Sequence, residues 1–333
     1  MQYDVRPTRI LVLLIWSLGI SASAAAGGEQ KAFPHLSRAV GGSRPAMVAV
    51  RSLQIGSDGR KRTVARNTGF LVSDSGDVVT SLYVWVQDGE LEVVASDGRR
   101  SKAQMKGVDQ HTGLALLRTD LEDTPHLRVA SSPPQKGEWI VAGVARARAS
   151  DRLDVLYSPG RLSSTNQERR MCGVKWQGLL TIDVAVVRGG AAAPVLDENG
   201  RLAAVILAGE KDDRGDSRAV AIGPEQFEKS LEMMRGGGRR TGWLGVVLSC
   251  DRDDDNAARV EAVLPGSPAH AAGLRRGDLL LSLDDRKVTC AAVLEDSVVR
   301  AEPGTEVTAS IRRDGKEKQV RVRIGPRPLH IPE

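Results

Sequence analysis

Short apolar runs separated by turn residues recur about every ten positions between residues 46 and 222, and this spacing most constrains the fold. The stretch NTGFLVSDSGDVVTSLYVWV (67–86) has the pattern of a strand, a Ser/Asp/Gly turn and a second strand. LEVVASDGRRSKAQMKGVD (91–109) and GLALLRTD (113–120) continue in the same way. Since Phe, Trp and Tyr make up only 3% of the residues, Val, Leu, Ile and Ala must fill the core. The pattern predicts a mainly β fold, either a sandwich or a barrel.

The N-terminal segment has the pattern of a secretory signal peptide over residues 1–26. Arg6 and Arg9 precede an apolar run from Ile10 to Ile20, and alanines with A-x-A spacing follow it. This run of eleven residues is shorter than the roughly 20 that cross a bilayer. We therefore expect an exported protein, periplasmic or in the cell envelope, that does not span the membrane after cleavage. An uncleaved N-terminal anchor is the alternative.

The segment GPEQFEKSLEMMRGGG (223–238) predicts a helix that ends the β-rich region. Pro224 suits the first turn, Phe227, Leu231 and Met234 share one face, and glycines follow the last turn. The last ninety or so residues alternate strands with two short helices and end in a hairpin at Asp314-Gly315. The expected division is a signal peptide at 1–26, a β-rich domain at 32–223, a helix and linker at 224–241, and a small α+β domain at 242–328.

Charge and cysteine usage exclude several classes of function. The formal net charge of +5 is dispersed among acidic residues, so no basic stripe for nucleic acid is present. Cys172, Cys250 and Cys290 are too far apart in sequence for a zinc knuckle, and the acidic run DRDDDN (251–256) lacks the ligand spacing of a calcium loop. We expect no metal and no cofactor. A Cys250–Cys290 disulfide is one option, and three buried unpaired cysteines are the other.

Several sequence blocks, in order and with similar spacing, resemble one protein family. NTGFLVSDSGDVVTSLYVWV resembles G-S-G-F-x5-G-x3-T-N-x-H-V, GVDQHTGLALLRT resembles D-x3-D-L-A-x-L-K, and TIDVAVVRGGAAAPVLDENG resembles T-D-A-x3-P-G-N-S-G-G-P-L-x4-G. The chain thus resembles the HtrA (DegP-like) family of exported serine endoproteases from about residue 33 to residue 324. The resemblance implies a trypsin-like double β-barrel followed by a PDZ domain.

The same comparison implies that the catalytic triad is absent. The family's general-base histidine matches Tyr83, its aspartate matches Gly113, and its nucleophilic serine matches Ala191. A methyl group cannot attack a carbonyl, and a phenol with a pKa of about 10 is a poor base near neutral pH. The resemblance therefore implies a pseudoprotease. Gly189 and the backbone amide of Ala191 match the oxyanion hole, although the turn alone would also explain this glycine.

Substitute catalytic groups are the alternative to an inactive site. His111 and Ser81 each lie two positions before a triad-matched residue, Gly113 and Tyr83. In the family's arrangement neither lies on the loop that its role requires. We therefore expect both to be ordinary loop residues.

The C-terminal domain carries the strongest sequence match to PDZ domains. PGSPAHAAGLRRGDLLLSLDDRKV (265–288) resembles P-G-S-P-A-x2-A-G-L-x2-G-D-x-I-x4-G-x2-V. PDZ domains bind an extended peptide as an added strand and hold its terminal carboxylate with loop amides. The residues expected to line the peptide groove are Trp243, Leu244, Gly245, Val246, Leu294 and Val298. The two helical residues, Leu294 and Val298, are core residues in the alternative interpretation.

These patterns predict an exported, proteolytically inactive HtrA-like protein. Its PDZ domain would bind peptide tails or unfolded segments in envelope protein quality control or regulation. One alternative is a serine endopeptidase with displaced catalytic residues, and another is a dead subunit that regulates active HtrA-like subunits. The resemblance also implies a homotrimer built on N-terminal aromatic residues, of which this segment has only Phe33.

Overall fold

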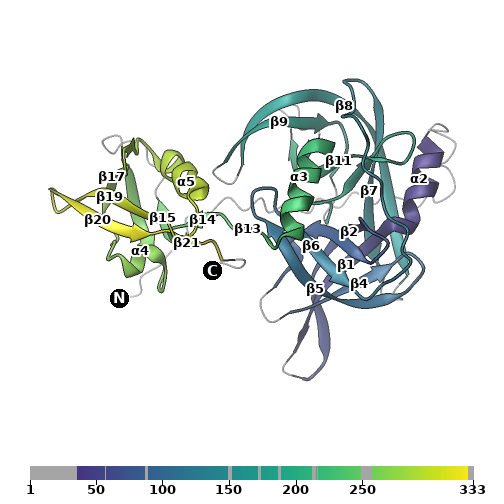
Figure 1. Cartoon of the computed structure of the whole chain (residues 1–333), viewed down its shortest axis with the longest axis horizontal. Coiled ribbons are helices and arrows are strands. Elements are labelled where there is room, and N and C mark those ends of the chain that lie inside the picture. The colour runs from purple at the N-terminus through teal and green to yellow at the C-terminus, as the bar shows by residue number, and fades with distance from the viewer. Residues whose placement is uncertain are drawn as a thin grey trace. The chain divides into compact units, whose positions relative to one another are not determined.

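The computed structural model is mainly β, as the sequence predicts (Figure 1). It describes residues 36–56, 58–86, 89–148, 152–171, 174–186, 189–211, 215, 217–248 and 257–328. The signal-peptide segment and Phe33 lie outside these ranges. None of the helices in this described part is long and apolar enough to cross a membrane.

The first barrel follows a short helix, α2 (Ser37–Ser43), and a 3-10 turn, η2 (Arg44–Ala46). Gly41 and Gly42 lie inside this helix. The strands run in the order β5-β4-β1-β2-β3-β6, and a β5–β6 pairing closes the sheet. Their bounds are β1 (Met47–Ile55), β2 (Lys61–Leu71), β3 (Asp77–Ser81), β4 (Glu90–Ala95), β5 (Arg100–Asp109) and β6 (Leu114–Thr119).

The second barrel closes in the order β10-β11-β12-β9-β8-β7. Its interior is filled by small and branched apolar side chains, as expected for a chain with few aromatic residues. The bounds are β7 (Trp139–Ala147), β8 (Leu153–Met171), β9 (Val174–Ile182), β10 (Pro194–Leu196), β11 (Leu202–Lys211) and β12 (Ser217–Ile222). The two barrels together are the trypsin-like arrangement that the sequence predicts.

Helix α3 (Pro224–Arg235) confirms the predicted helix and its buried face. Phe227 and Met234 are fully buried, and the ring of Phe227 lies 5.9 Å from that of Phe70 on β2. The glycines after the helix do more than link domains, because Gly238–Arg239 forms β13 and pairs with β5. At Gly238 a Cβ would lie 2.1 Å from the Val108 carbonyl oxygen, so the close approach requires glycine.

The C-terminal domain is a small antiparallel sheet with two helices. The sheet order is β15-β16-β17-β19-β20, with β18 paired to β17 and a separate β14–β21 pair. Asp314 and Gly315 both have positive φ, which confirms the predicted hairpin turn. The bounds are β14 (Gly242–Trp243), β15 (Val246–Leu248), β16 (Ala258–Val263), α4 (Pro268–Ala271), β17 (Leu279–Leu283), β18 (Arg286–Lys287), α5 (Ala291–Arg300), β19 (Glu306–Arg313), β20 (Lys316–Arg323) and β21 (Gly325–Pro326).

One buried ion pair in this domain joins Asp278, the residue before β17, to Arg313 at the end of β19. The Asp278 side chain is 1% exposed, and Arg313 donates two hydrogen bonds to it, at 2.6 and 2.7 Å. Burial raises the pKa of the Asp278 carboxyl, but the bonds from Arg313 and from the backbone of Arg275 outweigh burial, so this pKa lies below its ordinary value. The ionised form is therefore bound more tightly in the folded than in the unfolded domain.

Asp278→Asn should lower the free energy of unfolding at pH 7 by about 2 kcal/mol, because Arg313 loses its charged partner. Because the pKa of Asp278 is lower in the folded than in the unfolded chain, its ionised carboxyl stabilises the fold above the unfolded pKa of about 3.9. This stabilisation is lost as the pH falls through the folded-state pKa. The difference between variant and wild type should thus shrink between pH 5 and pH 3 in urea unfolding. Glu261→Gln, in an exposed pair with Arg276, is the control. Equal differences at both pH values would contradict this assignment.

Candidate functional site

The structure brings two of the three triad-matched positions together. Tyr83 lies on the 3-10 turn η3 (Leu82–Val84) and is 73% exposed. A Cβ placed on Gly113 would lie 3.9 Å from Cε2 of Tyr83, and the amide of Leu82 donates to the Gly113 carbonyl at 2.8 Å. A base at position 83 and a carboxylate at position 113 would thus be neighbours. Tyr83 supplies a phenol at the first position, and Gly113 has only a hydrogen atom at the second.

The third matched position, Ala191, lies in the turn before β10. This turn is tied to the first barrel through Thr68 on β2, whose amide donates to the Gly189 carbonyl at 3.2 Å. Thr68 in turn accepts a 2.7 Å bond from the hydroxyl of Thr80, at the end of β3 just before η3. Thr68 therefore connects the Gly189–Ala191 turn to the loop that carries Tyr83. Ala191 places only a methyl group at the nucleophile's position.

The turn keeps a backbone shape that would normally require glycine. Gly189 has φ +84°, and Ala192 has φ +62° although it carries a Cβ and is 1% exposed. The amides of Ala192 and Ala193 donate within the barrel, to the carbonyls of Ile206 and Gly190. Ala192 matches the first glycine after the family's serine. Sequence reasoning missed its strain, and the matched glycine was the available signal.

Ala192→Gly should raise the free energy of unfolding by about 0.5–1 kcal/mol. The left-handed conformation costs a residue with a Cβ about 1–2 kcal/mol, and the extra freedom of unfolded glycine offsets part of the gain. The urea midpoint of the full chain measures the change. Ala193→Gly, at a buried neighbour outside the left-handed region, should lower stability instead. A lower urea midpoint for Ala192→Gly than for the wild type would contradict the assignment of backbone strain to Ala192.

Neither proposed substitute residue is placed for catalysis by the contacts described. Ser81 is 1% exposed, and its hydroxyl accepts the backbone amide of Tyr83 at 3.3 Å, as an N-cap of η3. The ring of His111 lies edge-on to that of Trp176 on β9, with ring centres 6.4 Å apart. Both side chains therefore have structural contacts of the kind expected for loop residues.

The PDZ loop is held in a defined shape by its own carbonyl groups. Leu244 and Gly245 accept 2.9 Å bonds from the amides of Ala269 and Leu264. Gly245 has φ +77°, and a Cβ there would lie 2.2 Å from Cβ of Ser267. This position therefore excludes any side chain, which suits a loop that presents backbone to a ligand.

The expected groove residues fall into two groups. Leu244, Leu294 and Val298 are buried in the core of the PDZ domain, whereas Trp243 and Val246 are partly exposed. In the described part of the chain β15 is the terminal strand of its sheet, so one of its edges has no strand partner. An added peptide strand on this edge would contact Val246 directly. The roles of Leu294 and Val298 as the groove floor stay predictions.

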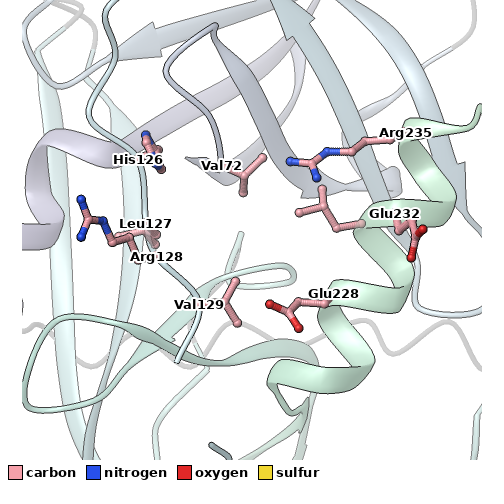
Figure 2. A pocket seen from close by; sticks show the side chains of 9 residues that line it. Val72, His126, Leu127, Arg128, Val129, Glu228, Glu232 and Arg235 are labelled. Carbon is pink, nitrogen blue, oxygen red and sulfur yellow. The ribbon is translucent and has the colours of Figure 1, made fainter. Parts of the chain in front are cut away.

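A separate hollow of about 580 Å³ lies between α3 and residues 126–129 (Figure 2). None of the triad-matched or PDZ-loop residues lines it. Four apolar residues form its floor: Val72, Leu127, Val129 and Leu231. The walls add His126 and four charged residues: Arg128, Glu228, Glu232 and Arg235. Its location separates it from the site defined above.

Comparison with protein families assigns both domains. Residues 67–205 match the trypsin-like peptidase domain, and residues 242–324 match the PDZ domain. By its domain content this chain joins a trypsin-like peptidase domain to a PDZ domain. The first match spans Tyr83, Gly113 and Ala191, so all three positions lie within the trypsin-like peptidase domain.

The curated relatives of this chain include several with the same printed name. A probable periplasmic serine endoprotease DegP-like of Chlamydia trachomatis is 28% identical over 282 residues, 80% of this chain and 55% of the relative. One of Halomonas elongata is 27% identical over 271 residues, 78% of this chain and 56% of the relative. The chain thus spans a little over half the length of these curated relatives.

Solved structures share the fold of this chain. A serine endoprotease from Yersinia pestis superposes with a TM-score of 0.58 at 22% identity, covering 88% of this chain and 98% of the other. The HtrA-type protease AlgW with a decapeptide gives a TM-score of 0.57 at 20% identity, covering 88% and 99%. These likenesses support the order of the two domains.

Metal ligands and cysteines are the next candidates for chemistry within the described ranges. No group of three or more His, Cys, Asp or Glu residues there is arranged to hold a metal ion. Cys290 is a free, exposed thiol at the N-terminus of α5. Cys172 and Cys250 lie outside the described residues.

Proposed function

We propose that this chain is a proteolytically inactive HtrA-type protein, exported to the periplasm or cell envelope. Its PDZ domain binds peptide tails or unfolded protein segments, in envelope protein quality control or regulation. The N-terminal pattern of residues 1–26 and the periplasmic names of the relatives support export.

The observation that carries the proposal is the chemistry of the three matched positions. Acyl transfer in this fold needs a hydroxyl nucleophile, a base to take its proton and a carboxylate to orient the base. Tyr83 and Gly113 are neighbours, and Ala191 lies in the turn that Thr68 ties to their loop. The arrangement keeps the scaffold of the site while lacking all three reactive groups.

Peptide binding is supported by the PDZ loop and by the open edge of β15. The bonded carbonyls of Leu244 and Gly245 hold the loop, and the apolar Val246 lies next to the buried Leu244. A strand added to β15 would gain main-chain hydrogen bonds, while the loop amides would face a terminal carboxylate. An aliphatic surrounding favours a hydrophobic terminal side chain.

Two alternative functions, an active endopeptidase and an inactive regulatory subunit, can be tested directly. A serine endopeptidase with displaced residues would degrade an unfolded, dye-labelled protein, and a serine-protease inhibitor would abolish the turnover. A dead regulatory subunit would coelute with an active HtrA-type protease during size exclusion. We expect neither turnover by the full chain nor dependence of tail binding on a second protein. Inhibitor-sensitive turnover would overturn the inactive assignment.

Binding of peptide tails can be measured independently of the cleavage assay. A dye-labelled peptide with a free carboxylate and a hydrophobic last residue should bind the full chain more tightly than the same peptide with an amidated end. Fluorescence anisotropy measures both dissociation constants. Equal affinities for the two peptides would contradict recognition of the terminal carboxylate, whatever the outcome of the cleavage assay.

A further inference from the structure

A second groove, of about 650 Å³, lies on the trypsin-like domain between β1, β2 and the last residues of β7. It reaches Gly189, in the turn that precedes Ala191. Arg51, Arg66 and Arg146 line it, and none of its lining residues is acidic. Val64, in a bulge of β2, adds an exposed apolar side chain. The groove therefore combines positive charge with an apolar contact.

Within the described residues, the wall formed by β2 includes a strand edge that has no strand partner. β2 pairs with β1 from Lys61 to Phe70, but with β3 only from Gly69 to Leu71. Thr68 donates its amide to Gly189 and accepts at its carbonyl from Thr80, so both groups face away from β1. The backbone amide and carbonyl of Arg66, two residues earlier in the strand, face the same edge. This edge can accept the main chain of an added strand.

Charges along one row of the sheet point to the kind of strand that would fit. The row crosses from Arg66 on β2 to Arg51 on β1, Glu92 on β4 and Lys102 on β5. Glu92 accepts a 2.7 Å bond from Arg51, so opposite charges meet between β1 and β4. Arg66, in contrast, lies directly opposite a like charge, which is unfavourable in a ladder. Among the described residues Arg66 forms no ion pair.

We propose that this groove binds an acidic, extended peptide segment as an added strand along β2, with a carboxylate side chain beside Arg66. That carboxylate would give Arg66 a neighbour of opposite charge, as Glu92 already does for Arg51. Alternate peptide side chains would reach the same face, where Val64 offers an apolar contact. This site is separate from the PDZ domain and does not depend on tail binding there.

The test uses the full chain and peptides without a free carboxylate terminus. A neutral-dye-labelled peptide of four Thr-Glu repeats, acetylated and amidated, should bind, whereas the Thr-Lys counterpart should not. Affinity should fall as salt rises, because the exposed charges are screened. Arg66→Glu should weaken binding by about tenfold, because an attraction becomes a repulsion. Fluorescence anisotropy gives each dissociation constant.

Matched variants separate charge from strand addition. Arg62→Glu makes the same change of charge on β2, at an exposed residue that does not line the groove, and should change affinity by less than about twofold. Arg66→Pro removes the outward amide that Arg66→Ala keeps, so it should bind more weakly than Arg66→Ala. Equal binding of the two peptides, or unchanged affinity in Arg66→Glu, would overturn the proposal. Loss of PDZ tail binding alone would leave it intact.

Discussion

Ala191→Ser alone is expected to leave the full chain without measurable turnover of an unfolded protein. The new hydroxyl would have no base, since Tyr83 is a phenol and Gly113 carries no carboxylate. Triad residues act as a unit, and one member contributes little without the others. Cleavage of a dye-labelled unfolded protein, with and without a serine-protease inhibitor, measures this. Strong turnover by the single variant would contradict the proposed loss of catalysis.

The triple variant Ala191→Ser, Tyr83→His, Gly113→Asp should exceed the single variant by about a hundredfold or more, because a positioned general base contributes about 10²–10⁴. The Cβ at position 113 would lie 3.9 Å from the present Tyr83 ring, an ordinary contact. Gly113 has φ +69°, so aspartate there costs some strain. The double variant that keeps Ala191 is the control and should remain inactive. Turnover by that control would assign the activity to another residue.

Gly245→Ala is expected to have the largest effect on the PDZ domain. The new Cβ would lie 2.2 Å from Cβ of Ser267, at a residue with φ +77°. Overpacking and left-handed strain together should lower the free energy of unfolding by about 3 kcal/mol. Any displacement of the loop also moves its amides, so affinity for a tail peptide should fall by about tenfold or more. Urea unfolding and anisotropy measure the two effects.

Gly273→Ala is the matched control for this prediction. Gly273 has φ +76°, almost the same as Gly245, but its Cβ would meet nothing within 4 Å. Gly273→Ala should lower the free energy of unfolding only by the cost of the left-handed backbone, about 1 kcal/mol, and should keep its affinity for the tail peptide. Equal destabilisation by the two variants would show that the contact with Ser267 is not decisive. Unchanged tail affinity in Gly245→Ala would place the peptide site elsewhere.

Local patterns were sufficient to predict most elements of the fold. The spacing of apolar runs and turns indicated a strand-rich region between residues 46 and 222, and helical spacing identified α3 with its buried residues Phe227, Leu231 and Met234. The hairpin turn predicted at Asp314-Gly315 also agrees with the structure. These features depend on residues close together in the chain, where side-chain periodicity reports directly on backbone conformation.

Contacts between distant segments were beyond the reach of these patterns. Closure of the first barrel by β5 and β6, and the pairing of Gly238–Arg239 with β5, depend on register between strands. The left-handed backbone of Ala192 also needed the structure, because its sequence contains no glycine to indicate it. Burial of Leu294 and Val298 is a further case, since the same helical spacing suits a core or a groove.

The sequence by itself determined which residues match the triad positions of the family that it resembles: Tyr83, Gly113 and Ala191. Only the tertiary structure decided what lies beside them. Thr68 joins the turn of Gly189 to the loop of Tyr83, and Arg66 faces Arg51 across a ladder. The reason is physical, because residue identity is a property of each position, whereas pairing and edge exposure arise when strands far apart in the chain come together.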